Sequence, residues 1–289
     1  MLSLEAFHQK ISEGIHILDG ATGSNLMKAG MPKGCCAEEW IINHPEPLVR
    51  LQRAYAAAGS QIIYAPTFQA QPLALEKVGL EKQTESINEA LVALSRSAAP
   101  NCLIAGDIAT MAAVCDSWDP DKFDLLVENY RRQIIGLIEG GADLIVAETL
   151  LYPQEAEAVL TAAALENAGA VMCSFTMQSD GSLFSGMDVG PVFTELEKAG
   201  AAALGFNCVA ADNLTAGLVS KLRRHTHLPI LCKPNAGNPI IGEDGLAHYS
   251  MEADEFGHIL RQCRQMGAAL IGGCCGTDPD YIAALRPEI

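Results

Sequence analysis

Eight short apolar runs alternate with longer segments of helical periodicity along this chain of 289 residues. Their continuous apolar character is typical of strands that are buried on both faces, as in a parallel sheet. The predicted strands are His16–Leu18, Gln61–Thr67, Cys102–Ile108, Asp143–Glu148, Val171–Thr176, Ala203–Cys208, Pro229–Pro234 and Ala268–Gly273. This alternation predicts an α/β fold, a single (β/α)8 TIM barrel that forms one domain over residues 1–289. A doubly wound open sheet is the alternative, but no Gly-x-Gly-x-x-Gly follows the first run.

The segments between the runs are predicted to be amphipathic helices. They span Pro47–Ala58, Glu81–Ser97, Asp121–Glu139, Pro153–Asn167, Val189–Lys198, Asp212–His225 and Met251–Met266. A last helix begins at Asp278-Pro279, where an aspartate cap precedes a proline in the first turn. A glycine follows several of these helices, as expected for a helix that must stop before the next strand.

The charge of the chain limits its partners. Lysine and arginine number 19 against 35 acidic residues, a formal charge of -16, so nucleic acid and anionic membrane surfaces are not expected to bind. Residues Met1–Gly14 lack the apolar segment of a signal peptide, and no apolar run is long enough to span a membrane. Ten cysteines in this length do not form a disulfide scaffold. We therefore expect a protein of the reducing cytoplasm, with free thiols.

Three cysteines follow apolar runs that are far apart in the sequence. Cys274 and Cys275 stand in Gly-Gly-Cys-Cys-Gly, and Cys208 ends the run Gly-Phe-Asn-Cys. Adjacent cysteines do not readily form a relaxed disulfide, but three thiolates with one open position are an arrangement of catalytic zinc. Buried cysteines beside a glycine turn are the simpler interpretation. A structural four-ligand zinc site is less favoured, because no fourth cysteine or histidine stands at zinc-finger spacing. A redox pair is also less favoured, because the sequence contains no Cys-x-x-Cys.

Polar residues stand at the ends of the other predicted strands. In a barrel the carboxyl ends of all strands meet at one rim, so these side chains are expected to form one pocket. They are Asp19, Thr67, Asp107, Glu148, Asn207 and Asn235, with the three cysteines. Each also has a structural interpretation, as a turn former, a helix cap or an ordinary strand residue. A second cysteine pair, Cys35-Cys36, has no matching ligands and no assigned role.

These motifs resemble those of the homocysteine S-methyltransferase family, over residues 10 to 285. The matching segments are Asp-Gly-Ala-Thr-Gly from Asp19, Thr67-Phe68, Glu148-Thr149, Asn207-Cys208, Lys-Pro-Asn-Ala-Gly from Lys233 and Gly-Gly-Cys-Cys-Gly-Thr from Gly272. Within the family the chain is most similar to the homocysteine-binding zinc barrel of cobalamin-dependent methionine synthases. It departs from the family at Pro66, at Ala109-Thr110 and in the loop Asp116–Pro120.

The resemblance implies a role for each matching residue. Cys208, Cys274 and Cys275 would bind Zn2+, with the homocysteine sulfur in the fourth position and Asn235 as the candidate ligand when substrate is absent. Asp19 and Glu148 would hold the amino group of homocysteine. Its carboxylate would meet Thr67 and the backbone amides near Gly20 and Ala21. Asn207 completes the expected substrate-binding set.

The expected reaction is methylation of homocysteine to methionine by a zinc-dependent S-methyltransferase. Three thiolate ligands leave a zinc centre negatively charged, so that a fourth sulfur keeps electron density for attack on a methyl group. The chain shows no Asp-x-His-x-x-Gly cobalt ligand and no S-adenosylmethionine loop, so the donor is expected from outside. A methyl-corrinoid (methylcobalamin) on a separate protein is favoured over S-methylmethionine or a similar small donor. The alternatives are a non-catalytic zinc- or thiol-binding barrel and a methyltransferase for another thiol.

Overall fold

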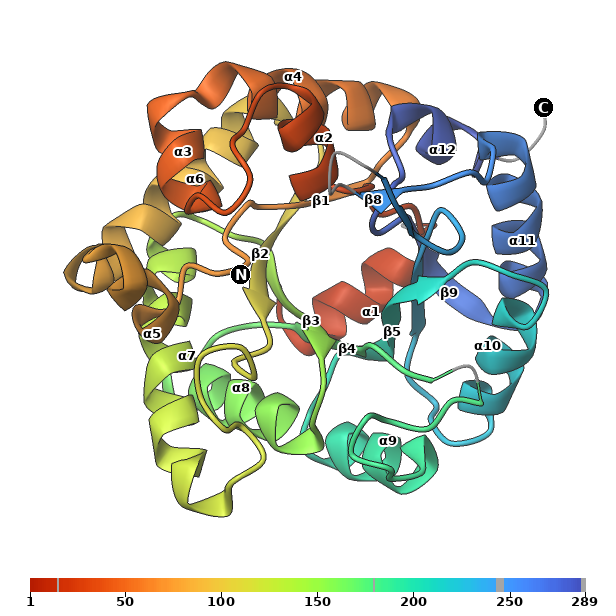
Figure 1. The fold of residues 1–289 in the computed structure, drawn as a ribbon. Helices are drawn as coiled ribbons and strands as arrows, with labels where there is room; N and C mark the ends of the chain where they lie inside the picture. Colours follow the sequence, from red (N-terminus) through yellow and green to blue (C-terminus); the bar gives the residue numbers. More distant parts are fainter. Residues whose placement is uncertain (15, 179, 243–246, 287–289) are drawn as a thin grey trace.

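A curled sheet of parallel strands forms the centre of the protein, and helices surround it (Figure 1). The computed structural model describes residues 1–14, 16–178, 180–242 and 247–286. Neighbouring strands pair in the order β1-β2-β3-β4-β5-β6-β9. Their bounds are β1 Ile62–Tyr64, β2 Leu103–Ala109, β3 Leu144–Leu150, β4 Val171–Phe175, β5 Ala203–Ala210, β6 Ile230–Asn235 and β9 Ala268–Ile271. They correspond to seven of the eight strands predicted from the sequence.

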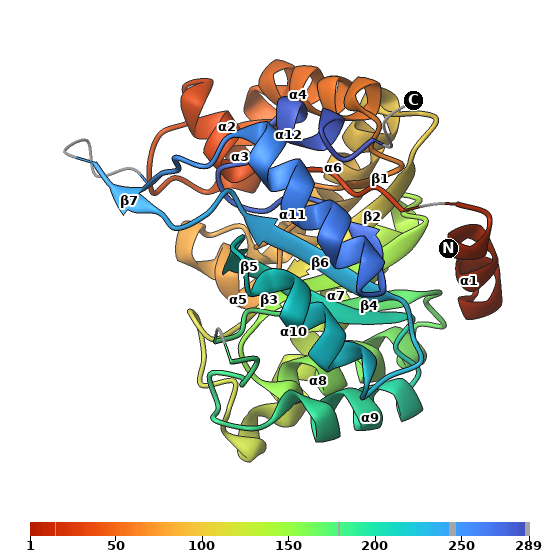
Figure 2. The same ribbon diagram turned by 90° about the vertical axis from the view of Figure 1, so that its right-hand side faces the viewer.

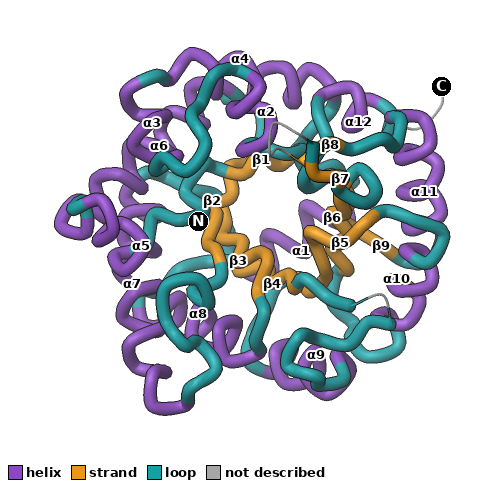
Figure 3. Tube along the Cα trace, in the orientation of Figure 1, coloured by secondary structure: helices purple, strands orange, loops and turns teal. Residues whose placement is uncertain are grey.

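The eighth expected strand, His16–Leu18, is reduced to a bridge that joins the two edges of the sheet. Ile17 forms a parallel bridge with Ile271 of β9, and the Leu18 N–H donates to the Ile271 carbonyl at 2.8 Å. On the other side, the Gln61 N–H donates to the Ile17 carbonyl at 2.7 Å. The strands therefore form the ring seen end-on in Figure 3, and the prediction of an α/β barrel is confirmed.

The predicted helices are present, with ends that differ by a few residues. They are α4 Pro45–Ala58, α6 Thr84–Ala98, α7 Phe123–Glu139, α8 Pro153–Leu165, α9 Val189–Lys198, α10 Thr215–Arg223, α11 Ala253–Gln265 and α12 Pro279–Ala283. The Asp278 side chain accepts from the Asp280 N–H and caps α12, as expected. Gly59 ends α4 with φ of 116°, a conformation that glycine adopts without strain. Within the described ranges, no helix is both long and apolar enough to cross a bilayer.

Several elements were not predicted. Helix α1, Leu4–Ser12, lies at one end of the barrel (Figure 2), where Phe7 and Ile11 join the apolar cluster that contains Leu18 and Leu144. At the opposite end stands the hairpin of β7 Ile240–Ile241 and β8 Ala247–His248. The remaining elements are the helices α2 Gly23–Lys28, α3 Ala37–Asn43 and α5 Pro72–Leu75, with 3-10 turns at Glu76–Val78, Glu81–Gln83 and Pro120–Lys122. Helix α1 therefore covers the amino ends of the strands and leaves the carboxyl ends to the loops.

Candidate metal centre and substrate cavity

The three predicted metal ligands meet at the carboxyl ends of the strands. The sulfur atoms of Cys208, Cys274 and Cys275 all lie within 4.8 Å of one another, and the Cys208 and Cys275 sulfurs are 4.0 Å apart. Cys274 is buried, while the other two are half-buried. Hydrogen bonds from Cys208 and Cys274 hold the pKa of the Cys275 thiol far below its ordinary value. The cluster therefore favours at least one thiolate, the form that binds metal.

Local irregularities of the backbone turn these cysteines toward one another. Cys208 has φ of 58°, and the pairing of β5 with β6 shifts register between Asn207 and Ala210. Such a bulge re-aims side chains at the end of a strand. Gly276, directly after the vicinal pair, has φ of 84°, and a Cβ atom there would come within 2.3 Å of Tyr249. Only glycine fits this turn, so the glycine beside the pair is required for the geometry.

Asn207 holds this region together from behind the cysteines. Its side-chain oxygen accepts from the Thr149 N–H and from the Ser174 hydroxyl, both at 2.8 Å. Its amide group donates to the Thr149 hydroxyl at 2.7 Å and lies 3.9 Å from the Cys274 sulfur. Thr149 has φ of 57°, which is strained for a β-branched residue. The structure thus places Asn207 as a support for Thr149 and Cys274, whereas the sequence predicted a substrate contact.

Asn235 also supports the cysteines. Its side-chain oxygen accepts from the Cys275 N–H at 3.0 Å, and its own carbonyl accepts from the Ala211 N–H at 3.1 Å. This hydrogen bond ties the side chain to the vicinal cysteines, and its role as fourth ligand stays a prediction. Among the described residues, Tyr249 is the aromatic side chain whose phenol lies beside the Cys275 sulfur.

A cavity of about 790 Å3 opens beside the cysteines. The loop after Ile17, the ends of β1, β2, β3, β5 and β6 and the β8 hairpin contribute to its wall. The predicted site residues that line it are Gly20, Ala21, Asp107, Glu148, Cys208, Cys274 and Cys275. The cavity wall does not include Asp19, Thr67, Asn207 or Asn235.

Asp19 and Thr67 are committed to neighbours in the barrel. Asp19 accepts from the Tyr64 N–H at 2.8 Å through one oxygen, while its other oxygen is 3.5 Å from the Lys233 ammonium. The Thr67 hydroxyl donates to the Asp107 carbonyl at 2.8 Å and accepts from the Asp107 N–H at 2.9 Å. Both side chains therefore have polar partners within the barrel, and their contact with a substrate stays a prediction.

A buried lysine and several carboxyl groups form the polar end of the cavity. The Lys233 ammonium lies 3.9 Å from Glu148 Oε2. Burial raises the pKa of Glu148 to about 8, although Lys233 opposes the shift. Burial likewise raises the pKa of Asp19 to about 6, again against the effect of Lys233. Burial acts to lower the pKa of Lys233 itself, but the charges of Glu148 and Asp19 outweigh it and raise the pKa. A positively charged Lys233 is thus the stable state.

Two contributors to this wall were missed from the sequence alone. Lys233 was noted only as part of a motif, and Tyr64 was not noted at all. The Lys233 ammonium lies 4.4 Å from the centre of the Tyr64 ring, which is a cation–π contact. A signal for Lys233 was available, because a lysine within an apolar strand must be paired. Tyr64 gave no such signal, because tyrosine is common in strands.

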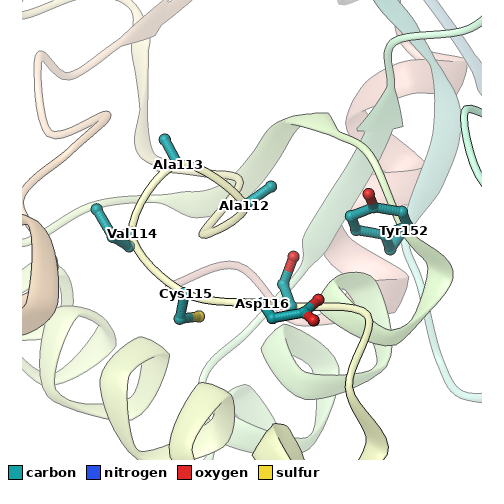
Figure 4. A pocket seen from close by; sticks show the side chains of 7 residues that line it. Ala112, Ala113, Val114, Cys115, Asp116 and Tyr152 are labelled. Atoms are coloured by element: carbon teal, nitrogen blue, oxygen red, sulfur yellow. The ribbon is translucent and has the colours of Figure 1, made fainter.

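A second hollow lies on the same rim. The loop Ala112–Ser117 curves around it, and Tyr152 forms its other side (Figure 4). Its volume is about 440 Å3. None of the predicted site residues lines it, so the larger cavity is the candidate site.

The cysteine cluster fits a zinc ion. Sulfur ligands at the usual zinc distance of about 2.3 Å in a tetrahedron stand about 3.8 Å apart. The 4.0 Å between the Cys208 and Cys275 sulfurs is close to this value. Three protein sulfurs on a cavity wall leave the fourth position to a ligand in the cavity. The donor set therefore favours zinc or another ion that prefers thiolates.

Comparisons with known sequences find relatives over nearly the whole chain. The model of the family described as homocysteine S-methyltransferase matches residues 16–289. Homocysteine S-methyltransferase of Escherichia coli is 30% identical over 297 residues, which cover 95% of each chain. Methionine synthase of Mycobacterium tuberculosis is 26% identical over 96% of this chain. This chain spans about a quarter of the length of that relative, 25%.

Solved structures show the same likeness. The metallated form of homocysteine methyltransferase MmuM from Escherichia coli superposes with a TM-score of 0.81 at 27% identity, covering 96% of this chain and 98% of MmuM. Its oxidized form gives a TM-score of 0.80. The first of these structures is metallated, and in the present chain three cysteines are placed so that they could hold a metal ion. The chain therefore belongs to the homocysteine S-methyltransferase family.

Proposed function

We propose that this protein transfers a methyl group to the sulfur of homocysteine and forms methionine, with Zn2+ held by Cys208, Cys274 and Cys275. The observation that carries the proposal is the meeting of these three sulfurs on the wall of a cavity that also contains Glu148 and Lys233. A thiol can enter this cavity with its sulfur toward the cysteines and its charged groups toward the polar end. The cavity thus suits a thiol that carries charges.

Different residues of the chain would support the metal ligands and bind the substrate. Zinc, when bound, favours loss of the thiol proton at neutral pH. Asn207 and Asn235 hold the cysteines through Cys274 and Cys275, so that the sulfurs are oriented before substrate arrives. Glu148 offers a carboxylate to the substrate amino group. All ten cysteines are described and free of disulfides, which supports a reducing compartment such as the cytoplasm.

The rim around the cavity supports a methyl donor that is carried by another protein. Phe184, Leu214, Ile240 and Ile241 are more than half exposed, and they lie on loops that follow the carboxyl ends of β4, β5 and β6. Large apolar side chains exposed at one end of a protein are typical of interaction surfaces. We therefore favour a methyl-corrinoid protein as the donor over a small donor such as S-methylmethionine.

The proposal is tested by supplying homocysteine with one donor at a time. Purified zinc-loaded protein would be mixed separately with methylcobalamin, S-methylmethionine, betaine and methyl-folate, and methionine would be measured. We expect methionine with methylcobalamin, and exclusive use of S-methylmethionine would replace the corrinoid part of the proposal. If homocysteine binds but no donor yields methionine, the non-catalytic barrel is the better interpretation. If another thiol is methylated instead, the substrate assignment is wrong.

Binding of homocysteine is expected to depend on pH through Glu148. Because burial raises the pKa of this carboxyl to about 8, it holds a proton at pH 6.5 and cannot pair well with an ammonium group. The KM for homocysteine should therefore fall as pH rises from about 6.5 to 8.5. Glu148→Gln should raise KM and remove this part of the pH profile. Asp278→Asn, which alters another carboxylate on the cavity wall, should keep the slope; an unchanged slope in Glu148→Gln would contradict the assignment.

A further inference from the structure

Lys233 has charge partners but poor hydrogen-bond geometry. It lies in β6, is 3% exposed and lines the cavity. Its ammonium is 3.5 Å from Asp19 Oδ1 and 3.9 Å from Glu148 Oε2, whereas charge-assisted hydrogen bonds are usually about 2.7–2.9 Å long. A lysine ammonium has three N–H donors, and burial makes unused donors costly. The cavity wall thus presents a buried cation that is held by long ion-pair contacts.

Several acceptor atoms around this lysine lack a hydrogen-bond partner. Within the described residues, Glu148 Oε2, Asp107 Oδ1 and Asp19 Oδ1 are buried without a hydrogen-bond partner. Glu148 and Asp107 line the cavity beside Lys233. Buried polar atoms are nearly always satisfied in folded proteins, so a cluster of unpaired ones indicates a missing ligand. Here the missing ligand must bring donors for the carboxylates and acceptors for the ammonium.

The head group of an α-amino acid meets both needs. Its ammonium can donate to Glu148 and Asp107, while its carboxylate accepts from Lys233, so that charges alternate in sign around the contact. The 3.9 Å between Lys233 Nζ and Glu148 Oε2 leaves both atoms free to contact neighbouring groups of one ligand at hydrogen-bond distances of about 2.8 Å. Asp19, behind Lys233, balances its charge when the carboxylate is absent.

The alternative carboxylate site, expected from the sequence, is partly taken. The Ala21 N–H already donates to the Thr277 hydroxyl at 3.2 Å. The same hydroxyl donates to the Cys274 carbonyl at 2.8 Å, so Thr277 links the loop after Asp19 to the vicinal cysteines. Releasing this amide for a substrate would break that link. Lys233 is held instead by long ion-pair contacts to Asp19 and Glu148.

We propose that Lys233 binds the carboxylate of the thiol substrate and thereby determines that the substrate carries a carboxylate. This inference rests on the proposed function and assigns recognition of one substrate group to a residue that the sequence comparison left without a role. It predicts that Lys233 discriminates between thiols by their carboxylate, independently of their amino group.

The test compares, on the zinc-loaded protein, three thiols that share a three-carbon link between the sulfur and the charged groups. They are homocysteine, 3-aminopropane-1-thiol, which lacks the carboxylate, and 4-sulfanylbutanoate, which lacks the amino group. Binding is measured by calorimetry without a methyl donor. In Lys233→Gln we expect the affinity for homocysteine and 4-sulfanylbutanoate to fall about 10- to 100-fold, the loss of one charge-assisted contact. The affinity for 3-aminopropane-1-thiol should change less than about threefold, because its ammonium does not need Lys233.

A double variant guards against misfolding. Lys233→Gln leaves Asp19 and Glu148 buried with less compensation, so Asp19→Asn/Lys233→Gln removes one charge of each sign and is compared with Asp19→Asn alone. Relative to Asp19→Asn, the double variant should lose affinity for homocysteine and 4-sulfanylbutanoate and keep its affinity for 3-aminopropane-1-thiol. Equal losses for all three thiols, or unchanged affinity for homocysteine, would overturn the proposal and leave Lys233 a purely structural role. Failure of the wild-type protein to bind any of the thiols would instead refute the proposed function.

Discussion

Cys208→Ser, Cys274→Ser and Cys275→Ser should each lose bound zinc and lower kcat/KM for homocysteine methylation by at least about 1000-fold. The three sulfurs lie within 4.8 Å of one another, so removing one leaves two sulfur ligands and an oxygen that binds zinc less well. Without the metal, a substrate thiol with a pKa of about 8.5 is mostly protonated at neutral pH. Zinc content by mass spectrometry of metals and initial rates of methionine formation measure the two effects.

The matched control is Cys115→Ser. Cys115 is half-buried, as Cys208 and Cys275 are, but it lies in the loop around the second hollow. This variant should keep one zinc per chain and the activity of the wild type. Retention of stoichiometric zinc in any of the three site variants would remove that cysteine from the proposed metal centre. Loss of zinc in Cys115→Ser would show that cysteine substitutions act on folding rather than on metal binding.

The second large effect is expected at Asn207. Replacement by leucine, which is similar in size, would leave the Thr149 N–H and the Ser174 hydroxyl without their acceptor. Unpaired buried groups cost about 1–3 kcal/mol each, so the free energy of unfolding should fall by about 3 kcal/mol. Release of Thr149 from its φ of 57° should also displace the adjacent Glu148 and raise KM for homocysteine. Urea denaturation and steady-state kinetics measure these changes.

Ser174→Ala provides a graded comparison. It removes one of the contacts of Asn207 and leaves the Thr149 contacts in place, so a loss of about 1 kcal/mol is expected with little change in KM. If Asn207→Leu proves no less stable than Ser174→Ala, the bonds to Thr149 do not hold that residue in place. A stable Asn207→Leu variant with normal KM would restore the simpler view of Asn207 as a strand residue without influence on the cavity.

The two asparagines show that residues of a recognised motif can hold the neighbouring site residues in place. Sequence resemblance placed Asn207 with the substrate and Asn235 with the metal, because each stands at the end of a strand near the cysteines. In the structure, Asn207 bonds Thr149 and Ser174, and Asn235 bonds the Cys275 N–H. Position along a strand determines which rim a residue reaches, but local twist and bulges determine which way its side chain points.

The amino-acid sequence by itself determined the barrel, its order of strands and helices, and the meeting of three cysteines at one end. These features follow from the period of apolar residues and from the rule that parallel strands present their carboxyl ends on the same side. Such patterns are local and repeat along the chain. For the same reason the sequence identified Glu148, which ends an apolar run and lines the cavity.

Only the tertiary structure decided which polar groups face the cavity. Asp19 turns behind Lys233, and Thr67 bonds Asp107, because backbone groups of neighbouring strands compete for the same side chains. The unpaired acceptors around Lys233 depend on β2, β3 and β6 and on the loop after Ile17, which only the closed barrel brings together. Burial makes it costly to leave these charges unpaired. Burial is a property of the whole fold rather than of any segment of it.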